Sequence, residues 1–90
     1  MRTVTLDGAL MQNKEQLHAH LHAQLDLPDY YGWNLDALYD ALTAYDKPLD
    51  IRLINRFELV DSLGRYGEAL IRTLEDAAEE NDRIRFRVVK

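Results

Sequence analysis

Three short segments in which apolar and polar residues alternate constrain the fold of this chain most. They are residues 3–7, 49–53 and 84–88, and in the last one the apolar residues share one face while arginines share the other. Strict alternation is typical of a strand with only one buried face. Because a helical pattern separates each segment from the next, the connections are crossovers and the three strands should run parallel.

Four helical segments should connect and follow these strands. They are expected from Asn13 to before Pro28, from Asn34 to about Ala44, from Asn55 to Leu63, and from about Tyr66 to Asn81. The first three begin at an asparagine, whose side chain can accept a hydrogen bond from the first turn of a helix. Gln16 completes a capping box with the first of these asparagines. The side chains expected to be buried on the last helix are Tyr66, Leu70, Ile71, Leu74, Ala77 and Ala78.

The layer arrangement follows from the alternation of the strands. Parallel sheets are usually covered on both faces, but a chain of 90 residues with these strands has too few helices for two covering layers. The sequence therefore predicts an α/β two-layer sandwich, a three-stranded parallel sheet with helices packed on one face. Residues 1–90 should form a single domain. Thr3, Thr5, Arg52 and the C-terminal arginines should lie on the open face.

The composition limits where the protein works and what it binds. The chain has no cysteine, no N-terminal signal pattern and no apolar run near the roughly 20 residues of a membrane span. We therefore expect a soluble cytoplasmic protein without disulfides, and no cofactor. The net charge is −5, but residues 28–50 hold five acids and one base, and residues 67–82 hold six acids and one base. The two acidic stretches favour a cationic partner and argue against direct binding of nucleic acid.

The segment from Asn34 to Ala44 carries the strongest functional signal. Asp36 and Asp40 share a face with Tyr39 and Thr43, opposite a row of leucines. Like charges four residues apart destabilise a helix by roughly 0.2–0.5 kcal/mol, and no lysine or arginine lies on this segment to offset them. A solvated face is the alternative interpretation. Five of the eight aromatic residues lie at positions 30–45, however, and that combination is typical of a protein-binding surface.

A longer motif surrounds these acids. Residues 27–43 read LPDYYGWNLDALYDALT, which resembles the signature L-P-x-Y-Y-G-x-N-L-D-A-L-x-D-x-L-T of the barstar family. The match is ungapped, and the order of strands, helices and prolines is similar over the whole chain. The resemblance implies the same three parallel strands with helices on one face. It also implies a 1:1 inhibitor of a barnase-type ribonuclease. We expect the free protein to be monomeric, although the sequence does not decide its oligomeric state.

The resemblance assigns expected roles to individual residues. Asp40 would be the main anchor, with its carboxylate in place of a substrate phosphate, and Asp36 would pair with a second cation of the nuclease. Tyr30 and Tyr31 would pack over the catalytic face. The remaining partner-binding residues implied or suggested by their position are Gly32, Trp33, Asn34, Tyr39, Thr43, Asp76 and Glu80. Asp76 and Glu80 lie one helical turn apart, so both could face the basic rim of the nuclease.

Some positions depart from the family. Tyr39 and Tyr45 stand where the type member has tryptophan, and Trp33 replaces a polar residue. Asp76 is shorter than the glutamate usually found there, and the characteristic cysteines of the family are absent. These changes suggest adaptation to a related but different nuclease. Among the aromatic residues we expect Tyr45 to belong to the core.

Other functions are weaker hypotheses. His18, His20 and His22 fall on the first helix, and we interpret them as a solvated face rather than a metal site. A small metal-dependent hydrolase, RNA binding through the C-terminal arginines, and an acidic module that binds another basic protein are the alternatives. The sequence does not decide between a cis and a trans Lys47–Pro48 bond.

Overall fold

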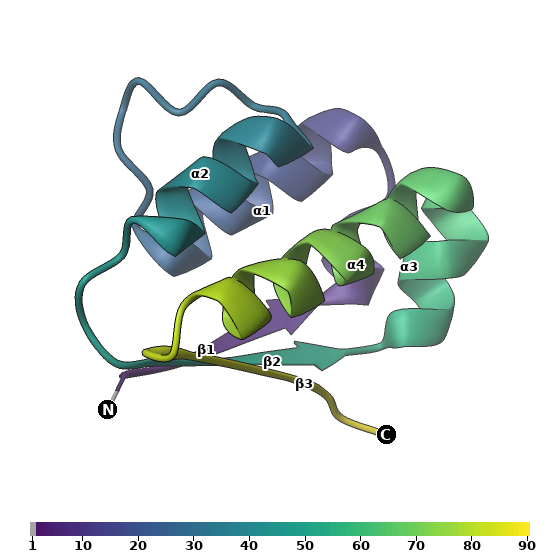
Figure 1. Cartoon of the computed structure of the whole chain (residues 1–90). Coiled ribbons are helices and arrows are strands. Elements are labelled where there is room, and N and C mark those ends of the chain that lie inside the picture. The colour runs from purple at the N-terminus through teal and green to yellow at the C-terminus, as the bar shows by residue number, and fades with distance from the viewer. Residues whose placement is uncertain (1) are drawn as a thin grey trace.

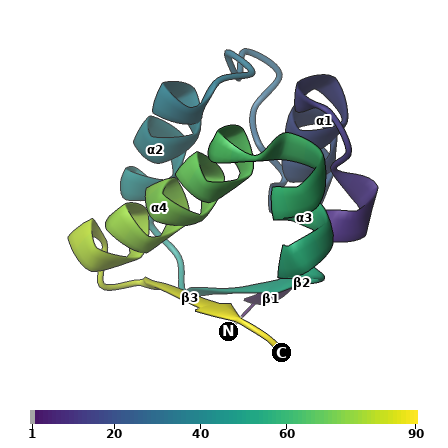
Figure 2. The same ribbon diagram turned by 90° about the vertical axis from the view of Figure 1, so that its right-hand side faces the viewer.

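The computed structural model describes residues 2–90 and contains a three-stranded sheet with helices on one side (Figures 1 and 2). The elements in chain order are β1 (Arg2–Asp7), the short 3-10 helix η1 (Gly8–Leu10), α1 (Lys14–Leu25), α2 (Leu35–Thr43), β2 (Leu49–Ile54), α3 (Arg56–Leu63), α4 (Arg65–Glu80) and β3 (Ile84–Val88). The strands are parallel, in the order β1-β2-β3. The predicted fold class is confirmed.

The register of the strands places their apolar residues side by side on the helix-covered face. Val4 pairs with Ile51, and Ile51 with Phe86. The inward residues of β1 and β2 are buried, whereas Phe86 and Val88 are half-buried. Ile84 at the start of β3 is buried, so only the later part of this strand is partly open to solvent.

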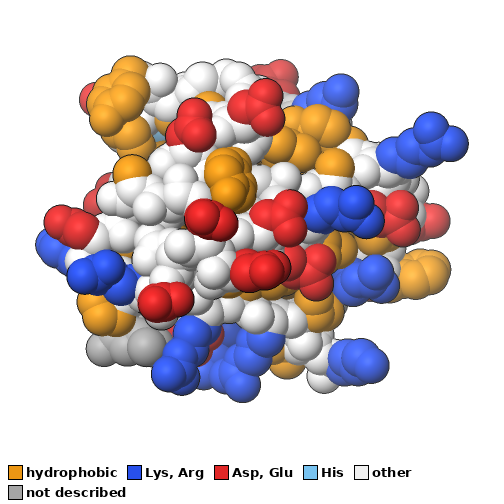
Figure 3. All heavy atoms as spheres, in the orientation of Figure 1, with side chains coloured by type: hydrophobic (Ala, Val, Ile, Leu, Met, Phe, Trp, Pro, Cys, Tyr) orange, Lys and Arg blue, Asp and Glu red, His pale blue; other side chains and the backbone are white. Residues whose placement is uncertain are grey.

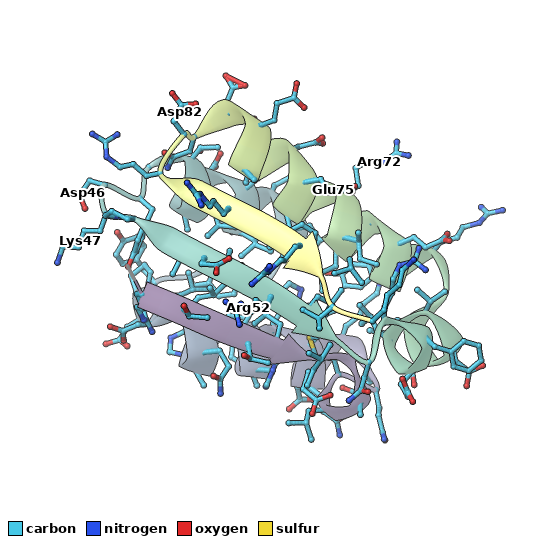
Figure 4. The ribbon with its side chains drawn as sticks, turned by 90° about the horizontal axis from the view of Figure 1, so that it is seen from below. Asp46, Lys47, Arg52, Arg72, Glu75 and Asp82 are labelled. Atoms are coloured by element: carbon cyan, nitrogen blue, oxygen red, sulfur yellow. The ribbon has the colours of Figure 1, made fainter. Side chains whose placement is uncertain are left out.

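The other face of the sheet is uncovered, as Figure 4 shows from below. Thr3 and Thr5 are exposed on β1, and Arg85 and Arg87 are exposed on β3, as the sequence predicts. Arg52 on β2 forms a salt bridge of 3.4 Å with Asp50 on the same strand. Surface ion pairs of this kind contribute about 0–1 kcal/mol. The open face is therefore a solvated polar surface that needs no covering layer.

Two of the three asparagine caps are confirmed. Asn13 accepts a hydrogen bond from the Gln16 backbone nitrogen at 2.8 Å, and Asn34 accepts one from the Ala37 backbone nitrogen at 2.7 Å. The Gln16 side chain accepts from the backbone nitrogen of Gln12 and not from that of Asn13, so the capping box is shifted by one residue.

The cap predicted for Asn55 is wrong. This residue adopts the left-handed conformation, with φ of 56°, and its side chain makes no cap to α3. Its amide instead donates to the Asp7 carboxylate at 2.8 Å. Asparagine is one of the few residues that tolerate this conformation, and its placement here ties the end of β2 to the end of β1.

The remaining predictions on burial are confirmed with two corrections. The leucine stripe of α1 and the side chains of Leu70, Ile71, Leu74 and Ala77 on α4 are buried. Tyr66 and Ala78 are only half-buried, at the edge of the core. All peptide bonds in residues 2–90 are trans, including Lys47–Pro48. In the same residues, no helix combines the length and apolarity that crossing a bilayer requires.

Gly8 gives the first test of this arrangement. A Cβ atom on this buried residue would lie 2.2 Å from the carbonyl oxygen of Asn55, so Gly8→Ala must displace the backbone. We expect a loss of about 2–3 kcal/mol in the free energy of unfolding. Gly64→Ala is the control because nothing lies within 4 Å and only its positive φ opposes the change, at a cost of about 1 kcal/mol. Urea unfolding measures both, and equal losses would contradict the close approach at Gly8.

Candidate functional site

Helix α2 presents one polar face outward and buries the other. Asn34 caps its first turn, and Leu38 and Leu42 are fully buried beneath it. Asp36 and Asp40 are exposed on the opposite side, as the sequence predicts. The helix therefore holds two carboxylates rigidly at the surface, one turn apart.

Tyr39 and Thr43 are less exposed than the two acids of this helix. Tyr39 is half-buried and packs against the core. The hydroxyl of Thr43 is held within the helix, 2.9 Å from the carbonyl oxygen of Tyr39 and 3.2 Å from that of Asp40. Both side chains thus help to shape the helix, and each keeps part of its surface at the site.

The carboxylates of α2 have no cationic partner among residues 2–90. In residues 2–90 the salt bridge between Arg52 and Asp50 is the only ion pair. Asp36 gains from the dipole at the start of the helix, but Asp40 lies beyond the first turn. The repulsion between them is uncompensated in the free protein, and a cation from outside would relieve it.

The loop of residues 28–34 precedes α2 and is held by its own hydrogen bonds. The Tyr31 backbone nitrogen donates to the carbonyl oxygen of Pro28 at 2.9 Å, and the Asn34 side chain donates to that of Gly32 at 3.0 Å. Trp33 adopts the left-handed conformation with φ of 52°, which is unfavourable for a bulky side chain. Backbone strain of this kind is often found in ligand-binding loops.

The aromatic residues of this loop differ sharply in exposure. Tyr30 is 89% exposed and Trp33 is 45% exposed, so both rings are available to a partner. Tyr31 is only 6% exposed and belongs to the core. Tyr45, the aromatic that we expected in the core, is half-buried. Tyr31, and not Tyr45, is therefore the aromatic residue of this region that belongs to the core, and it lies at the base of the site.

His18 explains why Tyr31 is buried. The histidine is 2% exposed, so the predicted solvated histidine face is wrong for this residue. Its Nδ1 atom lies 2.7 Å from the hydroxyl of Tyr31, and its Nε2 atom lies 2.6 Å from the hydroxyl of Tyr66. The Tyr31 hydroxyl also donates to the carbonyl oxygen of Asn34 at 3.3 Å. One imidazole thereby joins α1, the loop and α4.

Burial changes the acid–base behaviour of these groups. Desolvation lowers the pKa of His18, and the positive charge of Lys14 lowers it further. Desolvation also raises the pKa of Tyr31 and of Tyr66, which keeps both hydroxyls protonated. His20 is half-buried and accepts a hydrogen bond from the Asp7 backbone nitrogen at 3.0 Å; desolvation lowers its pKa more than the charge of Asp7 raises it.

A hollow of about 580 Å³ lies between the loop and the outer face of α2. Aromatic residues Tyr30 and Tyr45 and acidic residues Asp40 and Asp46 contribute to its lining. Aromatic rings beside carboxylates suit a cationic side chain. Asp46 is not among the site residues predicted from the sequence, although an acid directly after Tyr45 is a visible signal. A larger hollow, of about 720 Å³, is lined by alternating arginines and glutamates of α4 and by Arg56. Because both charges line it, this hollow favours neither a cationic nor an anionic ligand.

Helix α4 lies beside α2, so the two acidic stretches of the sequence form one surface (Figures 1 and 2). Asp76 and Glu80 are exposed on α4. The side-chain amide of Asn81 donates to the carbonyl oxygens of Leu42 and Tyr45, at 2.9 and 2.8 Å, and joins the ends of the two helices. Figure 3 shows acidic side chains gathered over α2 and α4, with lysines and arginines toward α3 and the sheet.

No three histidine, cysteine, aspartate or glutamate side chains of residues 2–90 come close enough together to hold a metal ion. The surface of α2, α4 and the loop carries exposed carboxylates beside aromatic rings, an arrangement that suits a cationic partner.

Comparison with known proteins agrees with this description. A family model described as Barstar (barnase inhibitor) matches residues 1–90. The chain is also similar to a Bacillus subtilis (strain 168) protein named "Putative ribonuclease inhibitor YrdF". The two are 45% identical over 82 residues, which cover 89% of each chain.

The lowered pKa values of buried His18 and half-buried His20 predict how stability depends on pH. The pKa values of His18 and His20 are lowered from the ordinary value of 6.5, so between the lowered values and 6.5 the unfolded chain binds more protons than the folded one. Their contribution is complete above pH 6.5 and is lost as the pH falls from there to the folded-state pKa values. Urea unfolding at a series of pH values should show this loss, and the double variant His18→Gln, His20→Gln should show a flatter profile. An unchanged slope would contradict it.

Proposed function

The chain belongs to the barstar family, a family of inhibitors and not of enzymes, and from this premise we propose that it inhibits a barnase-type ribonuclease by binding it one to one. The single observation that carries the proposal is the pair of exposed carboxylates on α2, which form no ion pair with any cation in the part of the chain that the structure describes. A nuclease that binds RNA phosphates must present cations in its cleft. A rigid row of carboxylates is complementary to such a cleft.

In this proposal α2 and the loop of residues 28–34 enter the RNA-binding cleft. Asp40 occupies the position of a substrate phosphate, and Asp36 pairs with a neighbouring cation. Tyr30 and Trp33 cover the catalytic face with their exposed rings, which excludes water and strengthens the charge pairs. Gly32 and Asn34 keep the loop in shape. Inhibition is reversible because no covalent bond is made or broken.

The acids of α4 extend the same surface. Asp76 and Glu80 face the basic rim of the nuclease while α2 fills its centre. Rim charges mainly speed association by steering the partners together.

The free inhibitor is monomeric and works in the cytoplasm, where it protects the cell from its own ribonuclease before the enzyme is secreted. The absence of cysteine is compatible with that reducing compartment.

Titration of RNA cleavage by a barnase-type ribonuclease tests the function. We expect activity to reach zero at one equivalent of inhibitor. Asp40→Ala leaves the buried cations of the nuclease unpaired, at a cost of about 3 kcal/mol or a hundredfold in Kd. Asp61→Ala, which removes an exposed acid of α3 far from the loop in sequence, is the matched control and should bind like the wild type.

The salt dependence adds a second readout to this experiment. Association should slow steeply as salt is added, since the opposite fields of the partners become screened. A nuclease that stays active in a large excess of the protein would contradict the proposal. It would favour the alternative, in which the acidic surface binds another basic protein.

A further inference from the structure

His18 connects three parts of the protein that are distant in sequence. It lies on α1, and its two ring nitrogens contact the hydroxyls of Tyr31 in the loop and Tyr66 on α4. The ring of Trp33 also lies beside the imidazole, with centroids 6.4 Å apart and the ring planes tilted by 39°. The imidazole is thus the direct link between the core and the two aromatic residues on either side of Gly32.

The hydrogen bonds around His18 are all satisfied only if the imidazole is neutral. The Tyr31 hydroxyl donates to the carbonyl oxygen of Asn34, so it must accept from Nδ1–H of the histidine. Nε2 then carries no hydrogen and accepts from the hydroxyl of Tyr66. This assignment of the tautomer follows from the network. All three hydroxyl and imidazole hydrogens then point along one chain toward the start of α2.

A protonated imidazole would break this chain. Both nitrogens would then donate, and the Tyr66 hydroxyl would have to turn its hydrogen away from Nε2. The new charge would also be buried, because His18 is only 2% exposed, and burying an unpaired charge is unfavourable. Lys14, whose Nζ atom lies 4.5 Å above the ring of Tyr66, adds a second positive charge nearby. The other titratable groups around it are Tyr31, Tyr66 and His22, whose ring packs against Tyr31.

We propose that neutral His18 is a positioning residue that holds the loop of residues 28–34 in its binding conformation, so that its protonation loosens the loop and weakens ribonuclease binding. The inference rests on the proposed function. A loop already in its bound conformation loses less entropy on binding. The protonated imidazole can still donate to Tyr31, but its buried charge gains water only if the rings of Tyr31 and Trp33, which lie beside it, move away. His18 acts through Tyr31 and Trp33 and touches no partner itself.

The test compares His18→Gln with His20→Gln. Glutamine does not titrate, and it lacks the imidazole ring that lies beside the rings of Tyr31, Trp33 and Tyr66. His20 is a matched control because its pKa is also lowered, while its ring accepts a hydrogen bond from the Asp7 backbone nitrogen at the end of β1, away from the loop. Circular dichroism establishes that each variant is folded. Tyr31→Phe is the second variant, since it removes the hydroxyl tether and leaves the ring in the core and the imidazole titratable.

The first readout needs no nuclease. Trp33 is the only tryptophan of the chain, so its fluorescence reports on the loop alone. Between about pH 7.5 and pH 5 the emission of the wild type and of His20→Gln should change in a single step below pH 6.5. The step should be absent in His18→Gln. An identical step in His18→Gln would overturn the link between His18 and the loop.

The second readout is the Kd for the ribonuclease over the same pH range. Titration of the nuclease itself cancels in the ratio of variant to wild-type Kd. For His18→Gln and Tyr31→Phe the ratio should be about five- to tenfold at pH 7.5 and fall toward one as the wild type protonates. For His20→Gln it should stay near one throughout. A ratio for His18→Gln that is constant with pH would overturn the positioning role. A wild type that binds no ribonuclease at pH 7.5 would refute the proposed function, and the fluorescence would still decide the role of His18.

Discussion

The burial of the apolar sides of α2 and α4 in one core is the interaction on which the surface depends. Leu38 and Leu42 of α2 and Leu70 and Leu74 of α4 are fully buried in the same cluster. Burying side chains of this size contributes about 1.5–3 kcal/mol each, whereas repulsion between surface carboxylates costs tenths of a kcal/mol. The core therefore holds two acidic helices together against their charge, and Asn81 fixes their ends to each other.

The same balance separates stability from function in this chain. A lysine or arginine on α2 would stabilise the free helix, but it would also occupy the carboxylates that we propose for the nuclease. Likewise the left-handed Trp33 costs conformational energy in the free protein. Unfavourable local interactions therefore persist at the site. Hydrophobic packing of the core and the helix caps at Asn13 and Asn34 offset their cost.

The sequence predicted the parts of the structure that depend on short-range patterns. Alternation gave the strands and their parallel order, and helical spacing placed Asp36 and Asp40 outward. The bonds of Asn55 and Asn81 were not predictable, because their partners lie 48 and at least 36 residues away. His18 carried an overlooked signal. It lies three residues before Leu21 and seven before Leu25, on the buried stripe of α1. Its polar partners depend on long-range contacts.

The distribution of charge makes the two sides of the molecule electrostatically different. Outside the two acidic stretches the chain has a net charge of +4, which follows from the total of −5. The arginines of β3 lie on the open sheet face, away from the layer of helices that carries the acids (Figures 2 and 4). In the field of a cationic cleft, a molecule charged in this way is turned so that α2 and α4 lead. In the proposed complex, the positive charge of the open sheet face disfavours the wrong orientation, although this face does not contact the partner.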